Sequence, residues 1–138
     1  MQQNYAAVIE LLDKYYDGLY YGDTGLLRDV FHPKARYVTV SGGQLLQLDM
    51  ASYFPIVEAR TSPQQLGEPY GFQIDSLEFA GPATALARVR SSMLGKDFID
   101  LLALIQIDGA WRIISKVFHY DLRSQPTNIS EPALERSA

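Results

Sequence analysis

The chain has 138 residues, of which 47% are hydrophobic and 20% charged, and its formal net charge is −4. This length fits one domain, and the apolar fraction is sufficient for a buried core. The acidic balance disfavours nucleic acid as a partner, because phosphate binding requires a concentrated basic surface. The chain has no cysteine, which excludes disulfides, thiolate metal sites and a cysteine nucleophile.

The N-terminal region predicts two helices. Apolar residues recur at helical spacing from Tyr5 until Gly22 ends the pattern. They form one stripe: Tyr5, Val8, Ile9, Leu12, Tyr15, Tyr16 and Leu19. Asp23 or Thr24 can cap a second, short helix that stops before Pro33. The first residues contain neither a signal peptide nor a membrane-length apolar run, so we expect a cytoplasmic protein with no membrane partner.

The middle of the chain mixes strand and helix signals. Residues 35–40 predict a strand, and residues 44–48 predict its hairpin partner. Residues 50–60 predict a third helix, which Asp49 can cap and which Pro55 should kink or shorten.

The second half of the chain reads as strands. After a loop rich in proline and glycine, four strands are predicted, at residues 72–79, 83–94, 97–107 and 110–120. Helices followed by a run of long antiparallel strands indicate an α+β fold with a strongly curved sheet, whose concave side can hold a cavity. We therefore expect one domain over residues 1–120 and a tail over residues 121–138 that is flexible or contacts a partner.

Four stretches stand in a characteristic order. They are YYDGLY at 15–20 followed by Gly22-Asp23, FHPKA at 31–35, VEAR at 57–60 followed by Ser62-Pro63, and the residues from DLLAL at 100 through IDGAWRI to KVF at 118. Together they resemble the NTF2-like superfamily, and within it the SnoaL-like and "putative lumazine-binding" families. The resemblance implies a cystatin-like cone of three N-terminal helices on a curved antiparallel sheet, commonly paired into homodimers through the sheet. Such proteins include isomerases, polyketide cyclases, dehydratases and binding modules, so a fold of this kind does not name a ligand.

Asp100 is the most informative polar residue. It stands between Ile99 and Leu101 in an otherwise apolar strand, where a carboxylate is costly unless it is paired, solvated or protonated. One interpretation is a cavity carboxylate that gives or takes a proton. The alternative is an aspartate near a strand end that bonds backbone groups or Lys116.

His119 lies on the next predicted strand. A two-residue turn at the end of this hairpin places Phe98 opposite His119, so that Asp100 and His119 share a face with their Cα atoms about 7–8 Å apart. Such a pair can serve as acid and base. One extra residue in the register would move His119 to the other face, where a half-exposed histidine needs no function. The same register places Lys116 opposite Leu101 on the outer surface, which favours a dimer interface for the lysine.

Other candidates are aromatic or cationic. Tyr16 continues the stripe of the first helix toward the sheet, as either a phenol donor at the cavity or a core aromatic. Tyr37 and Tyr53 are similar candidates, and Phe72 is expected to line the cavity. Arg60 can hold an anionic ligand, or it can simply favour a helix C-terminus.

The two histidines give little sign of a metal site. His32 resembles a helix-end cap, and it lies far from His119 in the sequence without any ligand spacing between them. We expect neither a metal nor a cofactor.

Three functional hypotheses follow. The first is a homodimeric domain that binds an unidentified small molecule between helices and sheet. The second is an enzyme of the isomerase, cyclase or dehydratase kind, in which Asp100 moves a proton while His119 and Tyr16 support an oxyanion. The third is a dimerisation module whose interior is filled.

Overall fold

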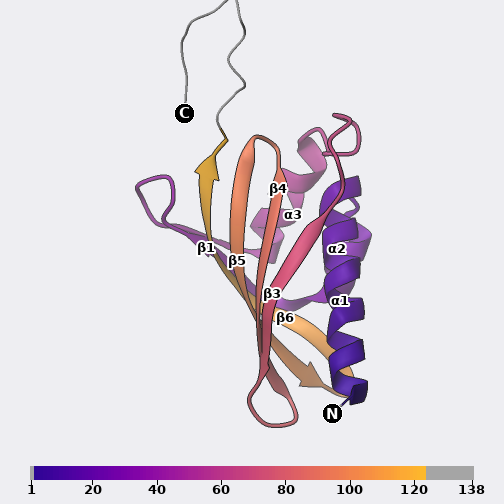
Figure 1. Cartoon of the computed structure of the whole chain (residues 1–138). Coiled ribbons are helices and arrows are strands. Elements are labelled where there is room, and N and C mark those ends of the chain that lie inside the picture. The colour runs from indigo at the N-terminus through magenta and orange to yellow at the C-terminus, as the bar shows by residue number, and fades with distance from the viewer. Residues whose placement is uncertain (1, 124–138) are drawn as a thin grey trace, which may run out of the picture.

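The computed structural model describes residues 2–123, which form three helices and six strands in the predicted order (Figure 1). The elements are α1 (Gln2–Tyr21), α2 (Thr24–Val30), β1 (Phe31–Thr39), β2 (Leu46–Asp49), α3 (Met50–Ala59), β3 (Phe72–Phe79), β4 (Thr84–Met93), β5 (Lys96–Ile107) and β6 (Ala110–Leu122). Strand β6 takes in the first two residues of the predicted C-terminal tail. The prediction for the rest of the tail, from residue 124 onward, lies outside the described residues.

Helix boundaries follow the expected capping residues. Gly22 ends α1 with a positive φ of 66°, a conformation that glycine adopts without a steric penalty. The Asp23 carboxylate then accepts hydrogen bonds from two backbone N–H groups at the start of α2, and the Asp49 carboxylate accepts one from Ser52 N at 2.9 Å. Helix α3 runs through Pro55, which is exposed, so the turn that lacks an N–H donor lies on the solvent side.

The six strands form one sheet in the order β2-β1-β6-β5-β4-β3. Neighbouring strands are antiparallel except β1 and β6, which pair in parallel, a contact that the sequence did not indicate. Figure 1 shows the long strands twisting around one side of α1. The architecture is therefore the predicted α+β cone, with the helices against the concave face of the sheet.

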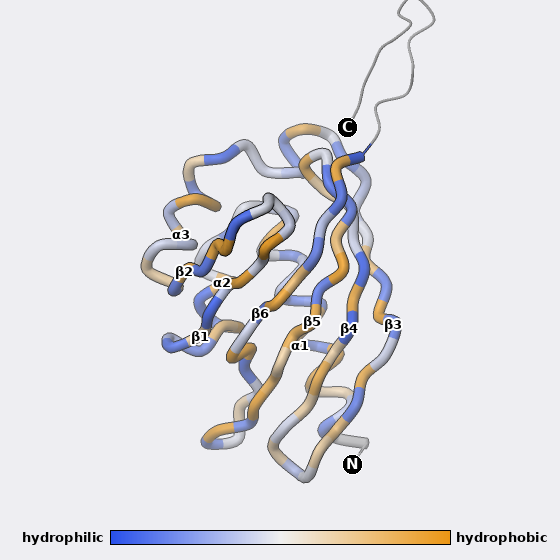
Figure 2. The backbone as a smooth tube through the Cα atoms, turned by 90° about the vertical axis from the view of Figure 1, so that its left-hand side faces the viewer, coloured by the Kyte–Doolittle hydropathy of each residue, from blue (hydrophilic) through white to orange (hydrophobic). Residues whose placement is uncertain are grey.

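The core lies between α1 and this concave face. Side chains alternate between core and solvent along the strands, and Figure 2 shows the matching alternation of hydrophobic and hydrophilic residues. Val8, Leu12 and Leu19 of α1 are buried, as their spacing predicts. Tyr5 was expected in the same stripe but is 54% exposed, while Leu11 is buried instead. Within residues 2–123, no helix is long and apolar enough to cross a membrane.

The β5–β6 hairpin contains the one register change that matters for the site. Ile107 pairs with Ala110 across a two-residue turn, as expected. Farther along, the register shifts by one residue beside Ala103 because Ile114 of β6 is left without a partner. Such a bulge moves every later side chain of the strand to the opposite face from the one predicted.

Candidate functional site

A carboxylate is buried in the centre of the sheet. Asp100 is 1% exposed on the concave face of β5, and Tyr16 of α1 donates a hydrogen bond to its Oδ2 at 2.7 Å. Its other oxygen, Oδ1, is 3.8 Å from Nζ of Lys116. Oδ1 has no hydrogen-bond partner among the described residues. Asp100 and Tyr16 are therefore buried side by side in the interior, and their role as catalytic or ligand-binding groups stays a prediction.

Lys116 lies beside Asp100 on the concave face of the sheet, whereas the expected register placed it on the outer face. The bulge at Ile114 turns it inward opposite Leu102, where it is 4% exposed instead of lying on the outer surface. Its Nζ donates a hydrogen bond to the Tyr15 Oη at 2.7 Å. Four aromatic rings surround the ammonium at 4.8 to 5.6 Å from their centroids, namely those of Tyr15, Tyr37, Phe98 and Phe118. Ring faces of this kind stabilise a cation that has lost its hydration.

The buried groups alter one another's protonation. Burial lowers the pKa of Lys116, and the neighbouring charge of Asp100 opposes this effect. Burial also raises the pKa of Tyr16, with a further contribution from the Asp100 carboxylate, to which it donates. Burial raises the pKa of Tyr53 to about 12, although Arg60 acts in the opposite direction. At neutral pH these phenols are therefore hydrogen-bond donors that retain their protons.

A small cavity of about 20 Å³ adjoins the lysine. Its polar lining comes from four elements or their ends: Tyr37 of β1, Tyr53 and Arg60 of α3 and its end, Ser91 of β4 and Lys116 of β6. The remaining wall is largely apolar, and the Tyr37 and Tyr53 rings stack at 4.3 Å. This volume accommodates a single water-sized group, so most of the interior is filled by side chains. Polar groups nevertheless converge on the space that is left.

A larger hollow lies on the other side of the cavity wall. This open groove of about 680 Å³ is bordered by residues 68–73 and by the adjacent parts of β4, β5 and β6. Phe72 lines the groove and stacks on Tyr16 with ring centroids 4.4 Å apart. Ser91 and Phe98 line both the groove and the small cavity, so these two residues form the partition between them.

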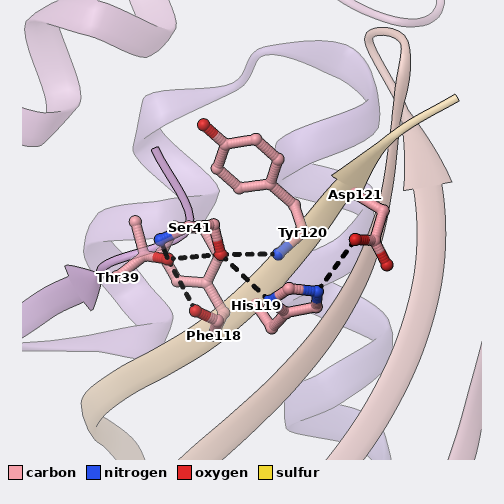
Figure 3. Close-up of polar contacts among 6 residues, drawn as sticks. All are labelled: Thr39, Ser41, Phe118, His119, Tyr120 and Asp121. Carbon is pink, nitrogen blue, oxygen red and sulfur yellow. Dashed lines mark hydrogen bonds and ion pairs between the residues drawn. The ribbon is translucent and has the colours of Figure 1, made fainter. Parts of the chain in front are cut away.

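His119 occupies a different site from the one predicted. It is exposed, it aligns with Ile99 and it does not pair with Asp100, because the bulge places it on the convex face. Figure 3 shows its contacts: Nδ1 lies 3.2 Å from the Ser41 Oγ, and Nε2 lies 3.1 Å from the Asp121 carboxylate. Although serine, histidine and aspartate can form a nucleophilic triad, the Ser41 Oγ here accepts a hydrogen bond from Tyr120 N at 2.9 Å. These contacts join the loop after β1 to β6.

The second histidine has a local role. Nδ1 of His32 accepts a hydrogen bond from Lys34 N at 3.0 Å within β1, whereas the residue that caps the end of α2 is Phe31. Among residues 2–123, no three His, Asp or Glu side chains lie close enough together to hold a metal ion.

The sequence predicted two members of the site incompletely. Tyr15 was assigned only to the core, and Lys116 was named as an alternative partner of Asp100 although the expected register placed it on the outer surface. A lysine in an apolar strand next to a buried aspartate on the neighbouring strand was the available signal, since a buried carboxylate requires a cation or several donors. The position of the bulge, which decides the face, is not encoded in any local motif.

Solved structures with the same cone define the class. An NTF2-like protein of unknown function from Shewanella baltica OS155 superimposes with a TM-score of 0.76 and is 25% identical, covering 86% of this chain and 94% of its own. A second NTF2-like protein of unknown function, from Silicibacter pomeroyi DSS-3, gives a TM-score of 0.74 at 27% identity, covering 87% of this chain and 98% of its own.

Sequence comparison identifies the family more narrowly. The family described as "Putative lumazine-binding" matches residues 3–119, and the chain belongs to this family. A curated relative, "Aldolase FrzH" from Cladobotryum sp, is 26% identical over 117 residues, which span 83% of this chain and 90% of the relative.

Proposed function

We propose that the protein binds a small, partly apolar organic molecule that carries an anionic or carbonyl oxygen, and that this oxygen lies in the cavity beside Lys116. The observation that carries the proposal is the convergence of Lys116, Arg60 and two tyrosine side chains on one interior space. Cationic and phenolic donors are the groups that recognise an oxyanion, and the aromatic and aliphatic walls suit an apolar body.

The size of the cavity requires that binding displaces part of its wall. The space of about 20 Å³ receives only the oxygen-bearing end of a ligand. Phe98 is half-buried and separates this space from the outer groove of about 680 Å³. A rotation of its ring joins the two volumes, so that the polar end of the ligand reaches Lys116 while its body lies in the groove.

Scanning calorimetry of the full chain tests the proposal with three probes: lumazine, benzoate and pyruvate. A ligand present at a hundred times its Kd stabilises the native state by about 2.7 kcal/mol, which corresponds to a rise in Tm of roughly 10 °C for a domain of this size. We expect at least one probe to raise the Tm, Arg60→Gln to abolish the effect and Arg88→Gln, a change on the convex face, to leave it intact. The proposal fails if no probe raises the Tm, or if the two variants respond alike.

A second candidate is an enzyme in which Asp100 transfers a proton. The 2.7 Å hydrogen bond from Tyr16 to Asp100 supports it, because a carboxylate and a phenol in one water-poor site can move a proton and stabilise an oxyanion. The aldolase named among the relatives adds support for carbonyl chemistry. Asp100→Asn keeps the shape of the side chain, so it should abolish any turnover while preserving ligand-induced stabilisation. Equal loss of both would leave only a structural role for Asp100.

We also propose a homodimer formed through the convex face of the sheet. Apolar side chains gather there on β4, β5 and β6, and Leu101 and Val117 are cross-strand partners that are 37% and 46% exposed. Light scattering at micromolar concentration should give the dimer mass for the wild-type chain and the monomer mass for Leu101→Glu. Ile56→Glu is the control, because Ile56 is 47% exposed on α3. A wild-type monomer would overturn the assembly.

A further inference from the structure

We propose that Lys116 is a covalent site: its amine condenses with the carbonyl group of a small 2-oxo acid to form a Schiff base. This inference rests on the proposed ligand site and gives it a chemical class. It also assigns to the lysine a role that extends beyond attracting an anion.

The geometry around Nζ is that of a shielded nucleophile. Among residues 2–123, Nζ has one hydrogen-bond partner, the Tyr15 Oη at 2.7 Å, and its side chain borders the small cavity. The titratable and charged groups that face it or line its cavity are Asp100 on β5, Tyr15 on α1, Tyr37 on β1, and Tyr53 and Arg60 on α3 and at its end. Burial of the ammonium favours the neutral amine, which is the form that attacks a carbonyl carbon. The exposed Lys14 and Lys34 lack such a setting.

The step can be written with atoms and charges balanced. The Lys116 ammonium transfers a proton to the Asp100 carboxylate, and the nitrogen lone pair then forms a bond to the carbonyl carbon. The carbonyl oxygen takes up one proton from the attacking nitrogen and one from the protonated Asp100 and leaves as water, while the nitrogen retains its last proton in a C=N double bond. The net change converts an ammonium and a ketone into an iminium and one water. Asp100 begins as a carboxylate 3.8 Å from the ammonium and ends as a carboxylate beside the iminium, so the buried pair never loses its charge balance.

Arg60 determines the class of carbonyl compound. It lines the same cavity as Lys116, and a guanidinium binds a carboxylate through two parallel hydrogen bonds. A molecule with adjacent carbonyl and carboxylate groups, as in pyruvate or glyoxylate, can therefore contact both cations within a small volume. An aldehyde without a carboxylate makes only the contact with the lysine.

Reductive trapping tests the proposal on the full chain. The protein is incubated at neutral pH with pyruvate and cyanoborohydride, which reduces an iminium to a stable secondary amine, and peptide mapping locates the adduct. The chain has four lysines, of which Lys14, Lys34 and Lys96 serve as internal controls. We expect Lys116 to be labelled more than each of them, because burial lowers the pKa of its amine and so raises the fraction in the neutral, nucleophilic form. In concentrated urea the four lysines should be labelled equally.

Two variants and one alternative probe identify the source of the labelling. Arg60→Gln should reduce labelling by pyruvate several-fold and leave labelling by propanal unchanged. Lys116→Arg should remove the preferential adduct. Labelling of Lys116 at or below the level of the surface lysines in the wild-type chain overturns the proposal, even if every variant fails to fold. If pyruvate raises the Tm without forming the adduct, the covalent step is wrong and the ligand site remains; if it does neither, both fail for this class of molecule.

Discussion

The attraction between Lys116 and Asp100 is measurable by a double-mutant cycle. Two unit charges 3.8 Å apart attract by about 4 kcal/mol at the effective dielectric constant of 20 that suits protein sites. Lys116→Met leaves the buried carboxylate without its cation, and we expect a loss of about 3–5 kcal/mol in the free energy of unfolding. Asp100→Asn keeps the acceptor for Tyr16 but removes the charge, so it should cost about 2–3 kcal/mol.

The double variant distinguishes coupling from simple packing. The double variant contains no buried charge at this site. Its free energy of unfolding should therefore be at least as high as that of Lys116→Met alone. The coupling energy is then about 2–3 kcal/mol, the upper range for residues in direct contact. Urea unfolding at pH 7, followed by the fluorescence of the single tryptophan, Trp111, and by circular dichroism, provides the measurement. Lys34→Met, at an exposed position, is the matched control and should change stability by less than about 0.5 kcal/mol. Additive costs in the double variant would refute the ion pair.

Three further predictions concern the partition, the helix packing and alkaline pH. Phe98→Ala opens the wall between cavity and groove, so trapping of pyruvate on Lys116 should become several-fold faster; an unchanged rate means that entry occurs elsewhere. Gly18→Ala places a Cβ 2.6 Å from a side chain of α2 and should cost about 1–3 kcal/mol in thermal unfolding, whereas Gly71→Ala, with open space around it, should cost far less. Above pH 10 stability should fall, because three buried tyrosines, including Tyr53 with its pKa near 12, and the half-buried Tyr37 keep protons that their unfolded counterparts release. The lowered pKa of Lys116 has the opposite effect on stability, because below about pH 10.4 this lysine binds more protons in the unfolded state than in the native state. Lys116 is one group, however, against four tyrosines. Urea unfolding curves at pH 9 and pH 11 measure the difference, and a higher stability at pH 11 would contradict the burial of these phenols.

The sequence predicted most of the fold because the signals are local. Apolar spacing located the helices, Asp23 and Asp49 located two helix starts, and the turn before Ala110 fixed where the last hairpin begins. The parallel pairing of β1 with β6 joins segments far apart in the chain. No local pattern specifies such a contact, and the sequence reasoning did not include it.

The site was predicted in part for the same reason. Asp100 breaks an apolar run, and a misplaced charge of this kind is visible in any sequence. Its true partner depends on the bulge at Ile114, which forms where the curved sheet must bend and shifts the register by one residue. That single residue exchanges the faces of Lys116 and His119, so the predicted register placed the histidine on the face of Asp100, and a bond from Asp100 to Lys116 was only the alternative.

The protonation of Lys116 tests the central claim most directly. In protein labelled with ¹³C at lysine Cε, NMR should resolve four side-chain resonances, one of which is absent in Lys116→Met. The account predicts that this resonance titrates at lower pH than the other three, because burial lowers the pKa of this amine. A Lys116 resonance that titrates together with those of the surface lysines would place the amine in water and contradict the site.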